Sequence, residues 1–227
     1  MERVNRLRTD NKKSFVTMFS QFCKATNWGN AEELTEILYG RFVVEDFYYS
    51  DDFKWFSVEN YLKTVVIPHK IAVFEAGFEL NKKLPNSARF DELEFVDNLW
   101  LHDLSKFSFV EAFGYSGWDF KTKSGDKVAF DAAWNHHKHH NPHHPENWLS
   151  VGRFGDVTVL PMPKIYVAEM VADWIGAGKT YGNSLENWLP DNLSSFKLHQ
   201  DSAVFLHEIL DAIGIKTKFV GSVLHTF

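Results

Sequence analysis

The chain has 227 residues and a mass of 26.3 kDa, and 44% of its residues are hydrophobic, which is enough apolar material for a substantial core. Its 30 acidic side chains outnumber 24 basic ones, so the formal charge of −6 argues against a long nucleic acid as substrate or partner. The one cysteine, Cys23, cannot close an intrachain disulfide, and apolar runs stop far short of the ~20 residues of a membrane-spanning helix. We therefore expect a cytoplasmic protein with no membrane partner.

The first third of the chain opens with helix signals. Apolar residues near Phe15 can share one side of a helix within residues 1–30. A second helix is predicted from Asn30, a residue type favoured at the N-cap, to Gly40, which should end it. Residues 42–55 are rich in β-branched and aromatic side chains, a composition typical of a strand or short β-hairpin, although a surface loop is an open alternative.

A long helix is predicted over residues 57–83, because apolar residues recur there every three or four positions. His69 falls on this apolar stripe. Pro68 has no backbone N–H and crowds the preceding turn, so it should kink the helix, or separate two helices, directly before His69. Taken alone, a histidine in such a stripe is more often hydrogen-bonded packing than a metal ligand.

The rest of the chain predicts further helices over residues 90–104, 108–115, 130–141, 163–177 and 201–213. The stretch 114–127, which supplies glycine, serine and charge, is predicted as a flexible loop. The sequence has no internal repeat and no linker rich in proline, glycine or serine. These patterns favour a single all-α domain, a helical bundle over residues 1–227.

Six of the 11 histidines lie between positions 136 and 144, and imidazole is the commonest protein ligand for transition metals. His136 and His140 share one helix face, whereas His137 lies on another, so these side chains cannot all bind one ion. The alternative is a histidine-rich surface segment that takes up metals adventitiously. The large apolar residues that frame the run, such as Trp134 and Trp148, favour a built site.

Two further groups of polar side chains lie in apolar surroundings. Asp103 follows His102 in an apolar stretch, where an unpaired carboxylate would be costly to bury, so a cation, a helix cap or an ion pair with Lys106 is expected. Glu169 and Asp173 are four residues apart on an otherwise apolar helix, and their carboxylates repel unless positive charge lies near. A metal ion would supply that charge, and so would a lysine or arginine of a neighbouring helix.

The order of these residues resembles the HD-domain superfamily, in which a helical bundle presents a histidine, a His-Asp doublet and a distant aspartate to a metal ion. Members with two metals insert further histidines between the doublet and the last aspartate. A metal-site core would then span about residues 57–177. The motifs His-Asp-Leu-Ser-Lys-Phe at 102–107 and His-x-x-x-Asn-x-His-His at 137–144 also resemble an uncharacterised family that occurs in phages and bacteria.

The resemblance implies one or two divalent metal ions, with Mn, Fe, Zn, Co and Mg all compatible. The implied shared ligands are His69, His102, Asp103 and Asp173. A second metal would be completed by His137 together with His143 or His144.

The implied activity is that of a metal-dependent phosphohydrolase acting on a nucleotide or another small phosphate ester through a metal-activated water. Lys106 would neutralise charge that develops on the phosphate, and Glu169 would act as general base or orient a ligand. Lys70 and Asn141 are candidate substrate contacts. The alternative role of Asn141 is to end a helix before Pro142.

Two other functions fit the same sequence. Two irons on the same frame of histidines and carboxylates would activate dioxygen, as in the oxygenase branch of the superfamily. A helical binding module with no catalysis could instead meet a protein partner through aromatic side chains such as Trp118, Phe120 and Trp188. The sequence does not indicate an oligomeric state.

Overall fold

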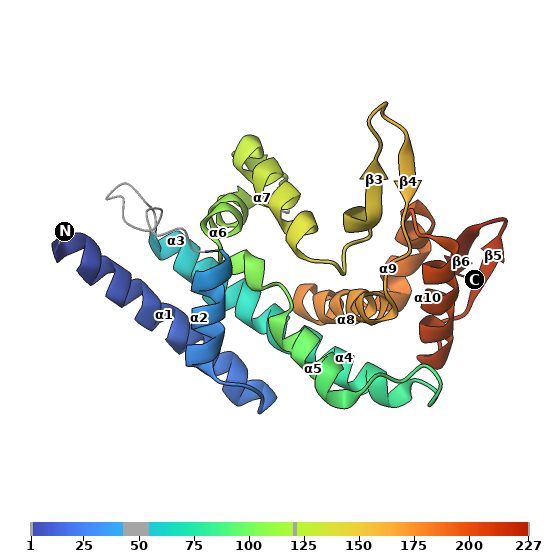
Figure 1. Ribbon diagram of the computed structural model, residues 1–227, viewed down its shortest axis with the longest axis horizontal. Helices are drawn as coiled ribbons and strands as arrows, with labels where there is room; N and C mark the ends of the chain where they lie inside the picture. Colours follow the sequence, from blue (N-terminus) through green and yellow to red (C-terminus); the bar gives the residue numbers. More distant parts are fainter. Residues whose placement is uncertain (1, 43–54, 120–121, 227) are drawn as a thin grey trace. The chain divides into compact units, whose positions relative to one another are not determined.

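The computed structural model describes residues 2–42, 55–119 and 122–226, and within them it shows a mostly helical chain with short two-stranded sheets (Figure 1). This result confirms the predicted all-α class. The stretch 42–55, for which a strand, hairpin or loop was expected, lies outside the described residues except at its two ends. The chain divides into two compact units. The prediction of one domain over residues 1–227 stays a prediction.

Unit 1 comprises residues 1–71 and 101–140. Its elements are α1 (Glu2–Thr26), α2 (Ala31–Arg41), α3 (Trp55–Tyr61), the π-helical turn η2 (Leu62–Val66), the start of α4 (Ile67–Lys83), the 3-10 turn η3 (Leu104–Phe107), α6 (Phe109–Ser116), β1 (Trp118–Asp119), β2 (Ser124–Gly125) and α7 (Lys127–His140).

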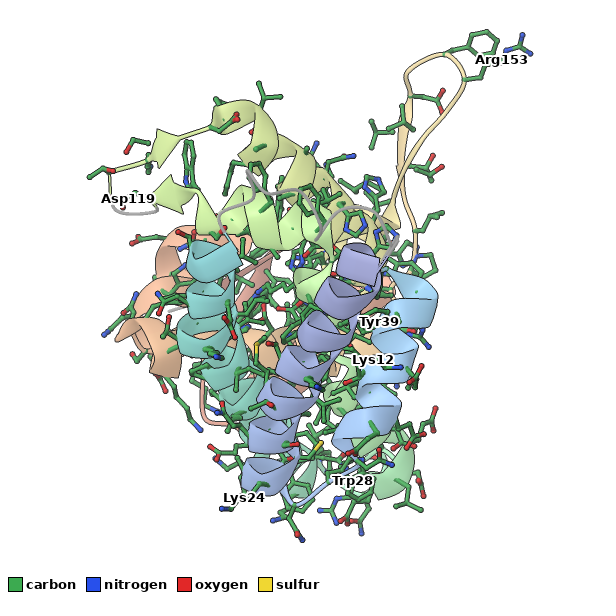
Figure 2. All side chains as sticks on the ribbon, turned by 90° about the vertical axis from the view of Figure 1, so that its left-hand side faces the viewer. Lys12, Lys24, Trp28, Tyr39, Asp119 and Arg153 are labelled. Carbon is green, nitrogen blue, oxygen red and sulfur yellow. The ribbon has the colours of Figure 1, made fainter. Side chains whose placement is uncertain are left out.

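Helices α1 and α2 lie side by side, as Figure 2 shows, with the Lys12 ammonium 5.7 Å from the centre of the Tyr39 ring. Asn30 caps α2 as predicted, because its side-chain oxygen accepts a hydrogen bond from the Glu33 backbone N–H at 2.7 Å. The prediction that Gly40 ends this helix is wrong. Gly40 does not take the left-handed conformation of a helix-ending glycine, and α2 continues to Arg41.

An aromatic cluster fixes η3 against α1. The ring of Phe107 lies 4.7 Å from that of Phe19 and 6.3 Å from that of Phe15, measured between centroids, and all three side chains are fully buried. Burying each of these rings stabilises the fold by about 1.5–3 kcal/mol. The cluster therefore anchors the segment that directly follows the His102-Asp103 doublet.

The irregularity predicted at Pro68 takes the form of the π-helical turn η2. The Ile67 backbone N–H donates to the carbonyl oxygen of Leu62, five residues earlier, and α4 begins at Ile67. The wider turn accommodates a residue that has no N–H and that would crowd the carbonyl one regular turn before it. His69 follows at once, in the first turn of α4.

Helices α6 and α7 lie side by side (Figure 1). They can pack closely because α6 carries a glycine at the contact. A Cβ atom on Gly114 would lie 2.4 Å from the carbonyl oxygen of Ala129 and 2.6 Å from the Cβ of Ala133. Only glycine fits such an approach without a shift of the backbone. This contact sets the distance between the two helices.

The stretch 114–127 differs from the predicted flexible loop. Strands β1 and β2 pair antiparallel within it, with Trp118 opposite Gly125. The Trp118 ring stacks on Phe130 of α7 at 4.6 Å between centroids, which anchors the small sheet to the helix.

Unit 2 comprises residues 72–100 and 141–227. Its elements are the rest of α4, α5 (Glu92–Leu101, apart from its last residue), η4 (Pro145–Trp148), β3 (Leu149–Val151), β4 (Val157–Val159), α8 (Lys164–Tyr181), α9 (Leu185–Asn192), η5 (Leu193–Ser195), α10 (Gln200–Ala212), β5 (Thr217–Val220) and β6 (Val223–Thr226).

The helices predicted over 163–177 and 201–213 are confirmed as α8 and α10. The helix predicted over 90–104 is present as α5, but it ends at Leu101, before the His102-Asp103 doublet that it was expected to include. Helix α9, which contains Pro190, and the antiparallel hairpins β3–β4 and β5–β6 were not predicted from the sequence. A proline within eight residues and strands of three or four residues leave too little periodicity to recognise.

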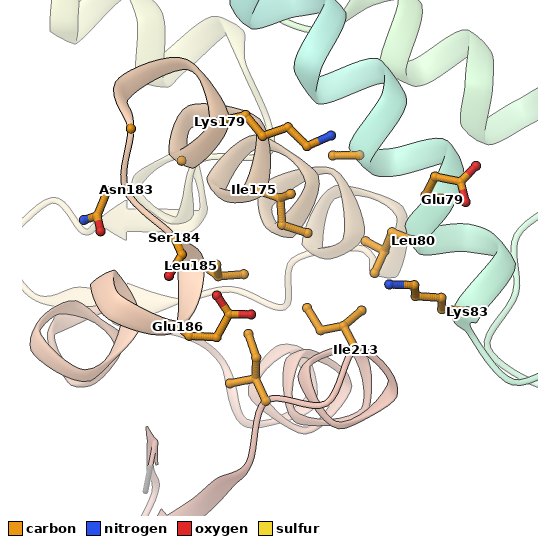
Figure 3. A pocket seen from close by; sticks show the side chains of 14 residues that line it. Glu79, Leu80, Lys83, Ile175, Lys179, Asn183, Ser184, Leu185, Glu186 and Ile213 are labelled. Carbon is orange, nitrogen blue, oxygen red and sulfur yellow. The ribbon is translucent and has the colours of Figure 1, made fainter.

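Unit 2 contains a cavity of about 600 Å³ (Figure 3). Its walls are apolar side chains such as Leu80, Ile175 and Ile213, together with charged ones such as Lys83 and Glu186. In the part of the chain that the structure describes, no helix combines the length and the apolar character needed to cross a bilayer.

Candidate metal centre

The predicted site residues divide between the two units. Those in unit 1 are His69, Lys70, His102, Asp103, Lys106 and His137. Those in unit 2 are Asn141, His143, His144, Glu169 and Asp173.

Asp103 is the central carboxylate of unit 1. It follows the end of α5 in the left-handed region, with φ 55° and ψ 23°, a conformation that aspartate tolerates better than most residues. Its side chain is only 1% exposed. A short turn between α5 and η3 therefore holds a buried carboxylate in place.

Three imidazoles surround this carboxylate, from α4, from the end of α5 and from α7. The Nε2 atoms of His69 and His102 lie 3.6 and 3.4 Å from Asp103 Oδ2. The Nε2 of His137 lies 3.6 Å from Asp103 Oδ1. All four side chains are buried.

These separations suit ligands of a shared cation. Two ligands of one tetrahedral ion, each bound at about 2.1 Å, lie about 3.4 Å apart. His69, His102 and Asp103 each offer a ligand atom within 4.8 Å of the others. Imidazole with carboxylate is a donor set that binds divalent transition metals, so the residues present in unit 1 fit the implied ion.

Lys106 also contacts the carboxylate, with its ammonium 2.6 Å from Asp103 Oδ2. The ion pair considered from the sequence is thus present, in addition to the imidazoles. Burial alone would raise the pKa of Asp103, but the charges of His102, Lys106 and His137 and the nearby imidazole of His69 hold that pKa well below its usual value. Asp103 is therefore ionised near neutral pH and able to act as a ligand.

Glu111, which was not predicted from the sequence as a site residue, orients His137. Its fully buried carboxylate lies 2.7 Å from His137 Nδ1 and 2.6 Å from His136 Nδ1. Burial raises the pKa of Glu111, but hydrogen bonds from the two histidines outweigh this effect, and the pKa lies below its usual value. An ionised carboxylate can only accept, so His137 donates from Nδ1, and the neutral ring has its lone pair on Nε2, the atom 3.6 Å from Asp103 Oδ1. Metal-binding histidines are commonly held in this way.

The sequence pattern around Glu111 indicates a helix cap rather than a contact with a histidine. Ser108-x-x-Glu111 matches the capping box, in which the glutamate side chain turns back to the first residue of the helix. Ser108 does cap α6, since its hydroxyl accepts from the Glu111 backbone N–H at 3.5 Å. The carboxylate, however, reaches across to α7 instead.

Lys70 contacts the backbone of the His102-Asp103 doublet. Its ammonium donates to the backbone carbonyl of His102 at 2.6 Å and lies 4.7 Å from the centre of the Phe22 ring, and the side chain is fully buried. These contacts support the backbone turn at His102. The predicted contact of Lys70 with a substrate stays a prediction.

In unit 2, Glu169 lies against a histidine and an asparagine. Its carboxylate lies 3.0 Å from His143 Nδ1 and accepts a hydrogen bond from the Asn98 side chain at 2.5 Å. Glu169 and His143 are both buried. Asn98 carried no recognisable signal in the sequence, because a single amide on a helix is common.

The remaining predicted residues of unit 2 lie near this pair in the chain. The backbone carbonyl of Asn141 accepts from the His144 N–H at 3.0 Å, and α7 ends just before Asn141, as expected before Pro142. The rings of His143 and His144 lie 4.3 Å apart between centroids. Asp173 is half-buried one turn after Glu169 on α8. That Asp173, His143 and His144 complete the centre of unit 1 stays a prediction.

Comparisons with known proteins give a family but no activity. No curated protein and no solved structure gives a significant match to the chain. A model of a family of unknown function, DUF5662, matches residues 58–212, a span that includes every residue of the predicted site. Because this match covers more than half of the sequence, the chain belongs to the DUF5662 family.

Proposed function

We propose that the protein is a metal-dependent phosphohydrolase that acts on a nucleotide or another small phosphate ester. The observation that carries this proposal is the group of three buried imidazoles around the ionised carboxylate of Asp103. The resemblance of the ligand order to the HD-domain superfamily supports the choice of reaction.

The side chains of unit 1 suit such a reaction. His69, His102 and Asp103 would hold a divalent ion, which when bound lowers the pKa of a water molecule and neutralises phosphate oxygens. His137 would join them, fixed in orientation by Glu111. Lys106, whose side chain is 16% exposed beside the carboxylate, would pair with an anionic oxygen of the substrate.

Side chains of unit 2 add two proposed roles. Asp173 would be the distant aspartate of the ligand order, and His143 or His144 would help to bind a second ion. Glu169, which already accepts from Asn98, would serve as general base or would orient His143. The order of residues in the sequence supports these roles.

Elemental analysis of untagged protein, followed by a phosphate-release screen over nucleotides, tests the proposal. We expect close to one equivalent or more of a transition metal and release of phosphate that stops on chelation and returns with manganese. His102→Ala should lose both, whereas His225→Ala, which changes a half-buried histidine of β6, should keep both.

Two results would contradict the proposal in different ways. Metal well below one equivalent, with no gain on adding manganese, would remove the metal centre and favour the binding module. Iron with its characteristic absorbance and consumption of dioxygen, without release of phosphate, would favour the oxygenase.

A further inference from the structure

A second pair of histidines lies on the outer side of α7, and neither belongs to the predicted ligand set. His136 and His140 are four residues apart, and their rings are stacked, with centroids 3.9 Å apart and planes inclined by 21°. The side chain of His136 is 22% exposed, and His140 is exposed. An ion in solution can therefore reach this pair.

The hydrogen bonds of the pair determine which ring nitrogen faces outward. His140 Nδ1 lies 2.8 Å from the backbone carbonyl oxygen of His136, and His136 Nδ1 lies 2.6 Å from Glu111 Oε1. A carbonyl oxygen and an ionised carboxylate only accept, so both rings carry their proton on Nδ1. When the rings are neutral, both therefore have their lone pair on Nε2, the form in which imidazole binds a metal.

Neighbouring elements hold the two rings in place. The ring of Phe42, which follows α2, meets His136 edge-on at 6.0 Å and His140 edge-on at 5.4 Å, measured between centroids. Glu111 of α6 also contacts His136, at its Nδ1 atom. Contacts from two other elements distinguish this pair from free surface histidines, whose side chains would have to be ordered by the ion itself.

We propose that His136 and His140 form an outer metal site, separate from the centre at Asp103, which binds a divalent ion of the zinc class with water completing the coordination. Imidazole nitrogens select Zn²⁺, Ni²⁺ or Cu²⁺ over Mg²⁺ and Ca²⁺. Zn–N bonds of about 2.0–2.1 Å in tetrahedral geometry place two nitrogens about 3.4 Å apart. The two rings are now stacked and nearly parallel, so their side chains must rotate before both Nε2 lone pairs face one ion.

Glu111 contacts a histidine of the outer site and a histidine of the inner centre, the group of His69, His102, Asp103 and His137. One carboxylate oxygen holds His136 and the other holds His137, so both imidazoles depend on the same carboxylate for their orientation. Loss of the Glu111 carboxylate should weaken binding at both sites, whereas loss of His140 should weaken binding at the outer site alone.

Titration of Zn²⁺ into metal-free protein, followed by calorimetry, tests the outer site. His140→Ala should weaken one class of Zn²⁺ binding by at least about tenfold and leave the other unchanged. The matched control is His139→Ala, which removes the adjacent exposed histidine, whose Nδ1 lies 2.6 Å from the Asn135 carbonyl oxygen. The control should bind Zn²⁺ as the wild type does.

The outcomes separate this site from the proposed function. In a His102→Ala background the outer site should still bind Zn²⁺ and should still be lost on adding His140→Ala, even if the inner centre binds nothing. If His139→Ala and His140→Ala lower the Zn²⁺ affinity equally, the pair binds an adventitious ion only. If His140→Ala leaves the Zn²⁺ titration unchanged, the outer site is likewise overturned.

A spectroscopic measurement gives an independent check. In ¹⁵N-edited spectra of the histidine rings, Zn²⁺ should shift the Nε2 resonances of His136 and His140 and leave their Nδ1 resonances in the protonated form. Shifts at Nδ1 instead, or at His139 in place of His140, would contradict the assignment. The thermal transition of each variant shows that the exposed substitutions leave the protein folded.

Discussion

At the scale of single residues, Asp103 is the point on which the inner centre depends. Asp103→Asn keeps the shape of the side chain but removes the charge that faces His69, His102 and Lys106. We expect the affinity for a divalent transition metal to fall by about 10–100-fold or more, since changes even to the supports of ligands have effects of that size. Competition with a chromogenic chelator measures the affinity.

The matched control for this substitution is Asp211→Asn, which removes an exposed carboxylate of α10 that pairs with Lys216 at 2.6 Å. Its metal affinity should equal that of the wild type. If the two variants bind metal alike, Asp103 is not a ligand, and its carboxylate serves only as the partner of Lys106.

Lys70 has a structural role at the same centre. Lys70→Met keeps an unbranched side chain but removes the ammonium that donates to the His102 carbonyl at 2.6 Å. A buried carbonyl that loses its donor lowers the free energy of unfolding by about 1–3 kcal/mol. Urea denaturation measures this loss, and metal affinity should fall as well because the turn at the doublet loses its support.

Lys82→Met is the comparison for Lys70, since Lys82 is exposed and pairs with Glu79 on the surface of α4. Its free energy of unfolding should change by no more than about 0.5 kcal/mol. Equal stability of the two lysine variants would show that the buried ammonium does not stabilise the turn.

At the scale of elements, the close packing of α6 on α7 positions Glu111 and His137 relative to each other. Gly114→Ala places a methyl group 2.4 Å from the Ala129 carbonyl oxygen, an obstacle of backbone rather than of a flexible side chain. The helices must move apart, so we expect a loss of about 1–3 kcal/mol in the free energy of unfolding and weaker metal binding. Thermal or urea denaturation and metal titration measure the two effects.

Gly40→Ala should raise the free energy of unfolding, in contrast to Gly114→Ala. Gly40 lies within α2 and has no atom within 4 Å of the position that a Cβ would take. Alanine there should stabilise the helix by up to about 1 kcal/mol. A stabilising effect at Gly114 of similar size would contradict the packing described for α6 and α7.

The elements also show how far the sequence could be interpreted. Helices with long apolar stripes and clear end signals, such as α8 and α10, were predictable, because the spacing of the apolar residues and the residues at the helix ends indicate the same segment. The π-helical turn before Pro68 could be expected only as an irregularity, since a proline specifies where a helix is disturbed and not how. The hairpins β3–β4 and β5–β6 are too short to show a period.

The candidate centre was predictable to a similar degree. The His102-Asp103 doublet and His137 could be chosen from their apolar surroundings and from the family resemblance, and the structure brings them together in unit 1. Glu111 could not, because its spacing from Ser108 fits a helix cap equally well. Contacts that join α6 to α7 depend on tertiary packing, which local spacing does not encode.

At the scale of the whole molecule, a bound ion should stabilise the fold, because the ligands of unit 1 come from α4, the end of α5 and α7 and are assembled only in the folded chain. At a free metal concentration 100 times the dissociation constant, binding adds about 2.7 kcal/mol to the free energy of unfolding. For a chain of 227 residues this corresponds to a rise in Tm of about 5–10 °C. Differential scanning calorimetry with added Mn²⁺ or Zn²⁺, and again with a chelator, measures the shift. With Mn²⁺, Asp103→Asn should show a clearly smaller shift, because an affinity about 10–100-fold lower leaves only about 0.4–1.4 kcal/mol of stabilisation at the same metal concentration. A shift as large as that of the wild type would place the stabilising ion elsewhere.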